Sequence, residues 1–180
     1  PKPFINLGIG GGTHGQNTGR MIEKIEEILL KIIPDGILVY GDTDSTLAAA
    51  ISGSKLKIPI FHVEAGLRSN LKYQPEEQNR VLTDHLSDLC FTPTKESMEN
   101  LKKEGISDSI IKYTGDVMAD TVRIFGQRIN NYDFIFKKLD IERKNYILMT
   151  IHRPENTKNK LRLENILSTI SYFQKIHNKY

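Results

Sequence analysis

The fold is indicated first by the stretch Ile58-Pro59-Ile60-Phe61-His62-Val63-Glu64, a short and mainly apolar run that ends in an acid. Such a run, with a proline near its start where a missing N–H donor is tolerated, predicts a buried β-strand. Similar runs at 37–40, 89–91 and 110–113 predict further strands. Longer amphipathic stretches lie between the runs. This alternation is typical of an α/β fold, a Rossmann-like parallel sheet with flanking helices.

The helices between the strands have ordinary start and stop signals. Apolar residues recur at helical spacing over 21–32, and Pro34-Asp35-Gly36 ends that helix. Pro75 fits the first turn of a second helix, and a third runs from about Thr94 to Gly105. A further helix is predicted over about 117–129.

The pattern divides the chain into three parts. Residues 1–129 form part of an N-terminal Rossmann-like domain, and the polar, lysine-rich stretch 130–145 is predicted to be an interdomain connection. Residues 146–180 are the start of a C-terminal Rossmann-like domain, with a strand at 146–151 and a helix from about Leu161. The chain opens without methionine and stops within a helical pattern, so we expect a piece, truncated at both ends, of a longer protein, here called the parent protein.

Composition excludes several classes of function. The 25 basic and 22 acidic residues leave a formal charge of +3, too small to indicate a nucleic-acid binder. The single cysteine allows no disulfide, and the five histidines have no metal-ligand spacing, so we expect no metal site. No apolar stretch approaches the roughly 18 residues of a membrane helix. We therefore expect a cytoplasmic protein with no membrane or nucleic-acid partner.

Polar clusters follow four of the predicted elements at the points where ligands bind in parallel α/β sheets. They contain carboxylates, arginines, an asparagine and a histidine. These candidate residues are Asp42, Glu64, Arg68, Glu76, Arg80, His152, Arg153, Glu155 and Asn156.

Simpler interpretations remain open for each cluster. Asp42, Asp44 or Ser45 could cap the helix that follows, and Glu76 could stand in a first helical turn because the helix dipole favours acids there. The arginines could pair with these acids alone. The glycine pattern Gly10–Gly15 has the form GxGxxG, but no acid follows at the spacing of a dinucleotide site. We interpret it as a flexible loop at the edge of the substrate site.

Several strings of the sequence resemble one enzyme family. They are Gly41-Asp42-Thr43, His62-Val63-Glu64-Ala65-Gly66-Leu67-Arg68, Pro75-Glu76-Glu77 with Asn79-Arg80, Phe91-Thr92-Pro93-Thr94, and Thr150 with His152-Arg153 and Glu155-Asn156. In this order and with these gaps, the set is similar to that of the non-hydrolysing UDP-N-acetylglucosamine 2-epimerases. The resemblance extends over essentially the whole chain, which would be about half of a typical member.

The resemblance implies a two-domain fold of the glycosyltransferase-B type with the substrate in the cleft between the domains. It implies interconversion of UDP-N-acetylglucosamine and UDP-N-acetylmannosamine without a cofactor, in a homodimer. Asp42, Glu64 and Glu76 would be acid and base groups, and His152 would stabilise the departing phosphate. Substrate contacts are expected from Arg68, Arg80, Arg153, Glu155 and Asn156.

Three alternative functions remain open. A glycosyltransferase of the same fold would transfer the sugar without exchanging hydrogen at C2. An NAD-dependent oxidoreductase would use the glycine loop. A non-catalytic nucleotide-sugar binding fragment is the third, because half of the cleft would be missing. We expect the isolated chain to be inactive, since its acids would face water instead of a closed site.

Overall fold

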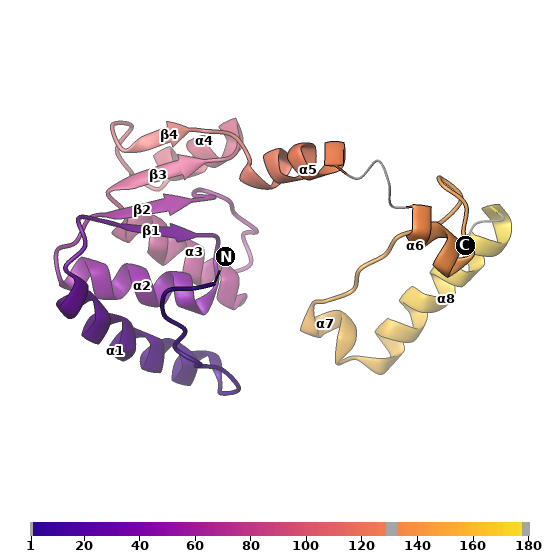
Figure 1. Cartoon of the computed structure of the whole chain (residues 1–180), viewed down its shortest axis with the longest axis horizontal. Coiled ribbons are helices and arrows are strands. Elements are labelled where there is room, and N and C mark those ends of the chain that lie inside the picture. Colours follow the sequence, from indigo (N-terminus) through magenta and orange to yellow (C-terminus); the bar gives the residue numbers. More distant parts are fainter. Residues whose placement is uncertain (1, 129–132, 178–180) are drawn as a thin grey trace. The chain divides into compact units, whose positions relative to one another are not determined.

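A computed structural model describes residues 2–128 and 133–177, drawn as ribbons in Figure 1. The chain divides into two compact units, Pro1–Val122 and Arg123–Tyr180. The predicted boundary between 129 and 130 lies outside the described residues, so the division into 1–129, 130–145 and 146–180 stays a prediction.

The first unit contains a four-stranded sheet in the order β1-β2-β3-β4. The strands are β1 (Ile37–Tyr40), β2 (Ile60–Val63), β3 (Leu89–Thr92) and β4 (Ile111–Tyr113). Each pairs in parallel with the next along the chain. The predicted parallel α/β sheet is therefore confirmed. Because the strands run in parallel, the residues that follow β1 to β4 meet at one edge of the sheet.

Helices lie between and beside the strands, and the first begins at His14, ahead of the apolar pattern predicted over 21–32. They are α1 (His14–Ile32), α2 (Asp44–Lys55), α3 (Pro75–Leu86), α4 (Lys95–Lys103) and α5 (Val117–Arg128). Thr13, Thr43 and Thr94 cap α1, α2 and α4 through their hydroxyl groups, and Pro75 stands at the start of α3. The helix α2 packs on α1, on α3 and on β1, and α4 packs on β3 and β4.

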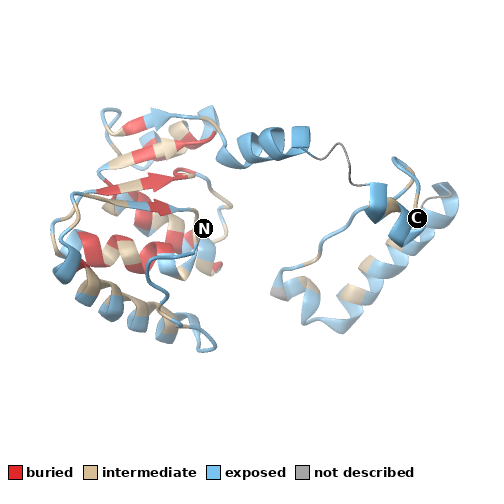
Figure 2. Ribbon diagram, viewed as in Figure 1, coloured by how far each residue is buried: buried red, intermediate tan, exposed pale blue. Residues whose placement is uncertain are grey.

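The core lies between the sheet and these helices, as the buried segments of Figure 2 show. Val39 of β1 is 5% exposed, whereas its neighbours Leu38 and Tyr40 are 49% and 57% exposed. Since side chains alternate along a strand, one face of β1 is packed and the other is open. Ile60 and Cys90, in the central strands, are buried more completely, at 1% and 0%.

The second unit differs from the prediction. Helix α6 (Asp133–Leu139) occupies part of the stretch expected to be a connection, and α7 (Pro154–Thr157) and α8 (Lys160–His177) follow. The predicted strand at 146–151 is wrong: these residues form no strand, and Leu148 is 84% exposed. A strand needs a neighbour for its N–H and C=O groups. Among the described residues, all paired strands belong to the first unit.

Candidate active site

Asp42 and Glu64 follow adjacent parallel strands. Tyr40 of β1 is paired with Val63 of β2, so the loops that carry the two acids leave the sheet side by side. Glu64 has a φ of 71°, and Gly41 before Asp42 has a φ of 65°. The left-handed conformation costs a non-glycine residue about 1–2 kcal/mol, and such outliers persist where surrounding structure fixes them. The backbone at Glu64 is therefore held in a strained conformation at this edge.

Helix α3 fixes the carboxylate of Asp42. Arg80 pairs with Asp42 through Nη2 and with Glu77 through Nη1, the latter at 2.8 Å. The Arg80 side chain is 16% exposed, so it is largely removed from water. The sequence left open whether Arg80 orients an acid or contacts substrate; the structure shows its ion pair with Asp42, and its contact with substrate stays a prediction.

The interpretation of Asp42 as a helix cap is wrong. The N-cap of α2 is Thr43, whose hydroxyl accepts from the N–H of Thr46. Asp44 is in the first turn, and its carboxylate accepts from Asn79 at 3.1 Å and lies 2.8 Å from Nδ1 of His14. Asp42 therefore stands outside the helix, in the loop after β1.

Asn79 is a site residue that the sequence analysis did not single out. Its Nδ2 donates to the backbone oxygen of Asp42 at 2.9 Å as well as to Asp44. Arg80 binds the side chain of Asp42, and Asn79 binds its backbone oxygen. Two consecutive residues of α3 therefore hold Asp42 in place. The available signal was the string Asn79-Arg80, which belongs to the quoted motif.

Glu77 is the second carboxylate that pairs with Arg80. Its carboxylate accepts from the backbone N–H groups of Ser69 and Asn70, each at 2.9 Å, and its side chain is 7% exposed. Burial by itself raises the pKa of Glu77, but the hydrogen bonds from Ser69 and Asn70 and the charge of Arg80 outweigh it. The pKa of Glu77 therefore lies below its ordinary value.

We expect Glu77→Gln to lower the free energy of unfolding at pH 7 by about 1–3 kcal/mol, because an amide accepts fewer of these hydrogen bonds. Because the pKa of Glu77 is lower in the folded than in the unfolded chain, its ionised carboxylate stabilises the fold at pH values above 4.5, the ordinary pKa. This contribution is lost as the pH falls through the folded-state pKa. The difference between variant and wild type should therefore shrink below pH 4.5. Urea unfolding followed by circular dichroism at pH 7 and at about pH 3.5 measures it. An equal loss at both pH values would contradict the assignment.

A hollow of about 250 Å³ opens beside Glu64 at the ends of the strands. Its lining is Glu64, Leu67, Pro93, Thr94, Asp116 and Met118. Ligand pockets usually measure about 300–1,000 Å³, so this hollow fits only part of a nucleotide sugar. Asp116, which the sequence analysis missed, adds a second carboxylate, and its Oδ1 accepts from the N–H of Met118 at 2.8 Å.

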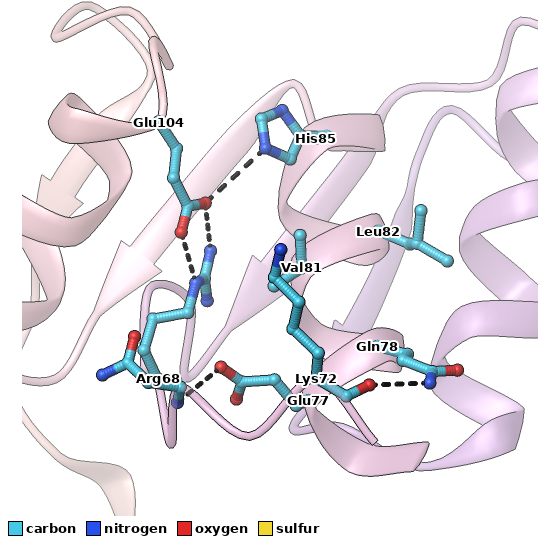
Figure 3. A pocket seen from close by; sticks show the side chains of 9 residues that line it. Arg68, Lys72, Glu77, Gln78, Val81, Leu82, His85 and Glu104 are labelled. Atoms are coloured by element: carbon cyan, nitrogen blue, oxygen red, sulfur yellow. Dashed lines mark hydrogen bonds and ion pairs between the residues drawn. The ribbon is translucent and has the colours of Figure 1, made fainter. Parts of the chain in front are cut away.

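Arg68 lies at a larger surface hollow of about 680 Å³, shown in Figure 3. Its Nε and Nη2 donate to Glu104 at 2.7 and 2.6 Å, and Nη1 lies 2.8 Å from Asp84. Burial lowers the pKa of Arg68, but the two carboxylates outweigh it and raise the pKa above its ordinary value. Since its side chain is 5% exposed, Arg68 ties the loop after β2 to the end of α4. Its predicted contact with substrate stays a prediction.

The other predicted site residues lie apart along the chain. Glu76 is exposed in the first turn of α3. His152 and Arg153 are exposed residues of the second unit, and Glu155 and Asn156 belong to α7, where the N–H of Asn156 donates to the oxygen of Arg153 at 2.9 Å. Within the first unit, the structure thus pairs Asp42 with Arg80 and sets Glu64 on the neighbouring loop, whereas Arg68 lies at a separate hollow.

The described residues 2–128 and 133–177 contain no group of three or more histidine, cysteine, aspartate or glutamate side chains arranged to hold a metal ion. In the same ranges, no helix has the length and apolar character needed to cross a membrane.

Comparison with known proteins gives consistent results. The chain matches the family described as UDP-N-acetylglucosamine 2-epimerase over residues 1–180. It is 55% identical over 169 residues to a UDP-N-acetylglucosamine 2-epimerase homolog of Methanococcus maripaludis, covering 93% of this chain and 47% of that protein. It is 47% identical over 176 residues to the UDP-2,3-diacetamido-2,3-dideoxy-D-glucuronate 2-epimerase of Pseudomonas aeruginosa, covering 97% and 48%.

A solved structure of the same kind matches the fold. It is the UDP-GlcNAc 2-epimerase of Methanocaldococcus jannaschii in complex with UDP-GlcNAc and UDP, with a TM-score of 0.90 and 44% identity, covering 99% of this chain and 49% of that one. The chain thus spans about half the length of the relatives it matches. The match over all 180 residues and the shared fold show that the chain belongs to the UDP-N-acetylglucosamine 2-epimerase family.

Proposed function

We propose that the parent protein interconverts UDP-N-acetylglucosamine and UDP-N-acetylmannosamine. The observation that carries this proposal is the placement of Asp42 and Glu64 after adjacent parallel strands, with Asp42 held by Arg80. The Methanocaldococcus jannaschii structure, 44% identical, contains UDP-GlcNAc and UDP, which supports a UDP-sugar as the ligand. A homodimer of the parent protein is part of the proposal.

The reaction requires acids and bases because the proton at sugar C2 is not adjacent to a carbonyl group. In the proposed route the C1–O bond breaks, UDP leaves with the electron pair, and loss of the C2 proton forms the C1=C2 bond of 2-acetamidoglucal. UDP then adds back to C1 while a proton reaches C2 from the opposite face. Because a proton leaves C2 from one face and another arrives from the opposite face, the reaction needs more than one proton-transfer group. Carboxylates also stabilise the cationic transition state.

The residues divide between these tasks. Asp42, Glu64 and Glu76 exchange protons with the sugar and stabilise the cation. His152 and Arg153 of the second unit would stabilise the departing phosphate, and Glu155 and Asn156 would contact substrate. Arg80 orients the Asp42 carboxylate through their ion pair.

A second candidate substrate is UDP-2,3-diacetamido-2,3-dideoxy-D-glucuronate, which is named for the Pseudomonas aeruginosa relative. This chain is 47% identical to that relative, and 44% and 46% identical to two archaeal UDP-N-acetylglucosamine 2-epimerases. The glucuronate sugar bears a carboxylate. Among the described residues, the lining of the 250 Å³ hollow includes Glu64 and Asp116 and no basic side chain. Like charges repel, so the acidic lining of this hollow favours the sugar without a carboxylate.

The test is an assay of the parent protein with each sugar nucleotide in separate reactions, with products separated by chromatography. We expect UDP-N-acetylmannosamine from UDP-N-acetylglucosamine, and no turnover by the isolated 180-residue chain. Free N-acetylmannosamine with UDP would indicate hydrolysis, and transfer to an added acceptor would indicate a glycosyltransferase. A change in nicotinamide absorbance would indicate an oxidoreductase. Binding of UDP without turnover would support the non-catalytic alternative.

A further inference from the structure

His62 is a buried histidine whose ring nitrogens both face acceptors. It belongs to β2 and its side chain is 0% exposed. Nδ1 lies 2.7 Å from Oδ1 of Asp84, and Nε2 lies 2.8 Å from the backbone oxygen of Gly41. A carbonyl oxygen only accepts, so Nε2 donates to Gly41. The ring therefore has a hydrogen-bond partner on each nitrogen, Asp84 on one side and Gly41 on the other.

Asp84 itself accepts from several segments of the chain. Its Oδ2 accepts from the backbone N–H of Gly66 at 3.1 Å and lies 2.8 Å from Nη1 of Arg68. With its Oδ1 on His62, it has partners on β2 and on the loop that follows β2. These contacts hold both carboxylate oxygens of Asp84 in place.

The three contacts join the segments that carry the candidate acids. Gly41, held by His62, directly precedes Asp42. Gly66 and Arg68 stand shortly after Glu64, and Asp84 belongs to α3, which also supplies Arg80. One carboxylate thus connects the loop of Asp42, the loop of Glu64 and the helix whose first turn carries Glu76.

The ion pair of Asp84 with Arg68 is buried, with side chains 0% and 5% exposed, and its cost calls for an explanation. Burying a charged pair costs several kcal/mol per ion, and apolar side chains of similar volume often give equal or greater stability. Stability alone therefore does not account for the pair, whereas the fixed spacing of the two acid-bearing loops does.

We propose that Asp84, acting through His62 and through the Gly66 N–H, is a positioning residue that sets the separation and direction of Asp42 and Glu64 for proton transfer at C2. This proposal rests on the proposed function. Proton transfer is sensitive to geometry: misplacement by about 1 Å can cost about 100-fold in rate. Removal of Asp84 should accordingly slow the chemical step and leave binding of the nucleotide nearly unchanged.

Asp88 provides a matched control. Its Oδ2 accepts from the backbone N–H of Ile60 at 2.8 Å, so it also links the α3–β3 region to β2 by a carboxylate. Ile60 is the first residue of β2, at the opposite edge of the sheet from Glu64. Asp88 is exposed, so Asp88→Asn removes a carboxylate contact between this region and β2 without touching the loops of the candidate site.

The test compares Asp84→Ala, Asp84→Asn and Asp88→Asn in the parent protein, with kcat and KM measured for UDP-N-acetylglucosamine. We expect Asp84→Ala to lower kcat by about 30- to 100-fold with KM within about threefold of wild type. Asp84→Asn should recover part of the loss, because its side-chain oxygen can still accept from the Gly66 N–H. Asp88→Asn should keep kcat within about twofold.

Two results would overturn the proposal: a folded Asp84→Ala variant with wild-type kcat, or equal losses of kcat in Asp84→Ala and Asp88→Asn. A wild-type parent protein without epimerase activity would instead contradict the proposed function. An independent measurement is the ¹⁵N–¹H correlation spectrum of the parent protein labelled at histidine. We expect the side-chain signals of His62 to shift in Asp84→Asn and to keep their wild-type positions in Asp88→Asn. Unchanged His62 signals in Asp84→Asn would contradict the contact through which Asp84 acts.

Discussion

Glu64→Gln in the parent protein is expected to lower kcat for epimerisation by about 100- to 10,000-fold, the usual contribution of a general acid or base. The side chain lines the hollow at the strand ends, and its backbone is fixed at a φ of 71°. Glutamine has nearly the same shape, so the fold should persist. It neither exchanges the C2 proton nor carries the charge that stabilises an oxocarbenium-like transition state. The initial rate of UDP-N-acetylmannosamine formation measures the effect.

Glu23→Gln is a suitable control for this variant. Glu23 is an exposed acid on α1, so its replacement changes the net charge equally without altering the strand-end site. We expect its kcat to equal that of wild type. If Glu64→Gln retained kcat within about threefold of the control, Glu64 would have no role in proton transfer.

Gly66→Ala is expected to lower the free energy of unfolding by about 4 kcal/mol or more. A Cβ at this position would lie 2.2 Å from the backbone oxygen of Ser97 and 2.9 Å from Cγ of Leu101. Ser97 and Leu101 are 1% and 0% exposed, so neither can move aside without disturbing the core. Overpacking typically costs about 1–3 kcal/mol and more where backbone must shift, and the φ of 78° adds about 1–2 kcal/mol for alanine. A loss of this size is a large part of the total stability of a domain.

Gly105→Ala separates steric overlap from backbone strain. Gly105 has a φ of 85°, and a Cβ there would meet nothing within 4 Å. This variant should lose only about 1–2 kcal/mol, the cost of the left-handed conformation for alanine. Urea unfolding of both variants, followed by circular dichroism, measures the difference. Equal losses would mean that the close approach of Gly66 to Ser97 contributes nothing.

Much of the first unit could be predicted from local sequence. The apolar runs at 37–40 and 58–63 became β1 and β2, and Pro75 marked the start of α3, because strand periodicity and capping chemistry depend on near neighbours. Asp42 and Glu64 could be placed at one edge because parallel strands share their direction.

Other features depend on contacts between distant residues. The pairing of His62 with Asp84 joins positions 22 residues apart, and that of Arg80 with Asp42 joins positions 38 apart. No local pattern shows which acid an arginine or histidine will meet. The predicted strand at 146–151 failed for the same reason: apolar residues alone do not form a strand without a neighbouring strand to pair with.

The most direct test of the proposed reaction is proton NMR of UDP-N-acetylglucosamine with the parent protein in heavy water. Elimination and re-addition of UDP remove the original C2 proton and return one from solvent. We therefore expect deuterium at C2 in the manno epimer and, as the reaction reverses, in the gluco sugar as well. A parent protein that binds UDP but leaves C2 fully protonated would contradict the assignment of Asp42 and Glu64 to epimerisation.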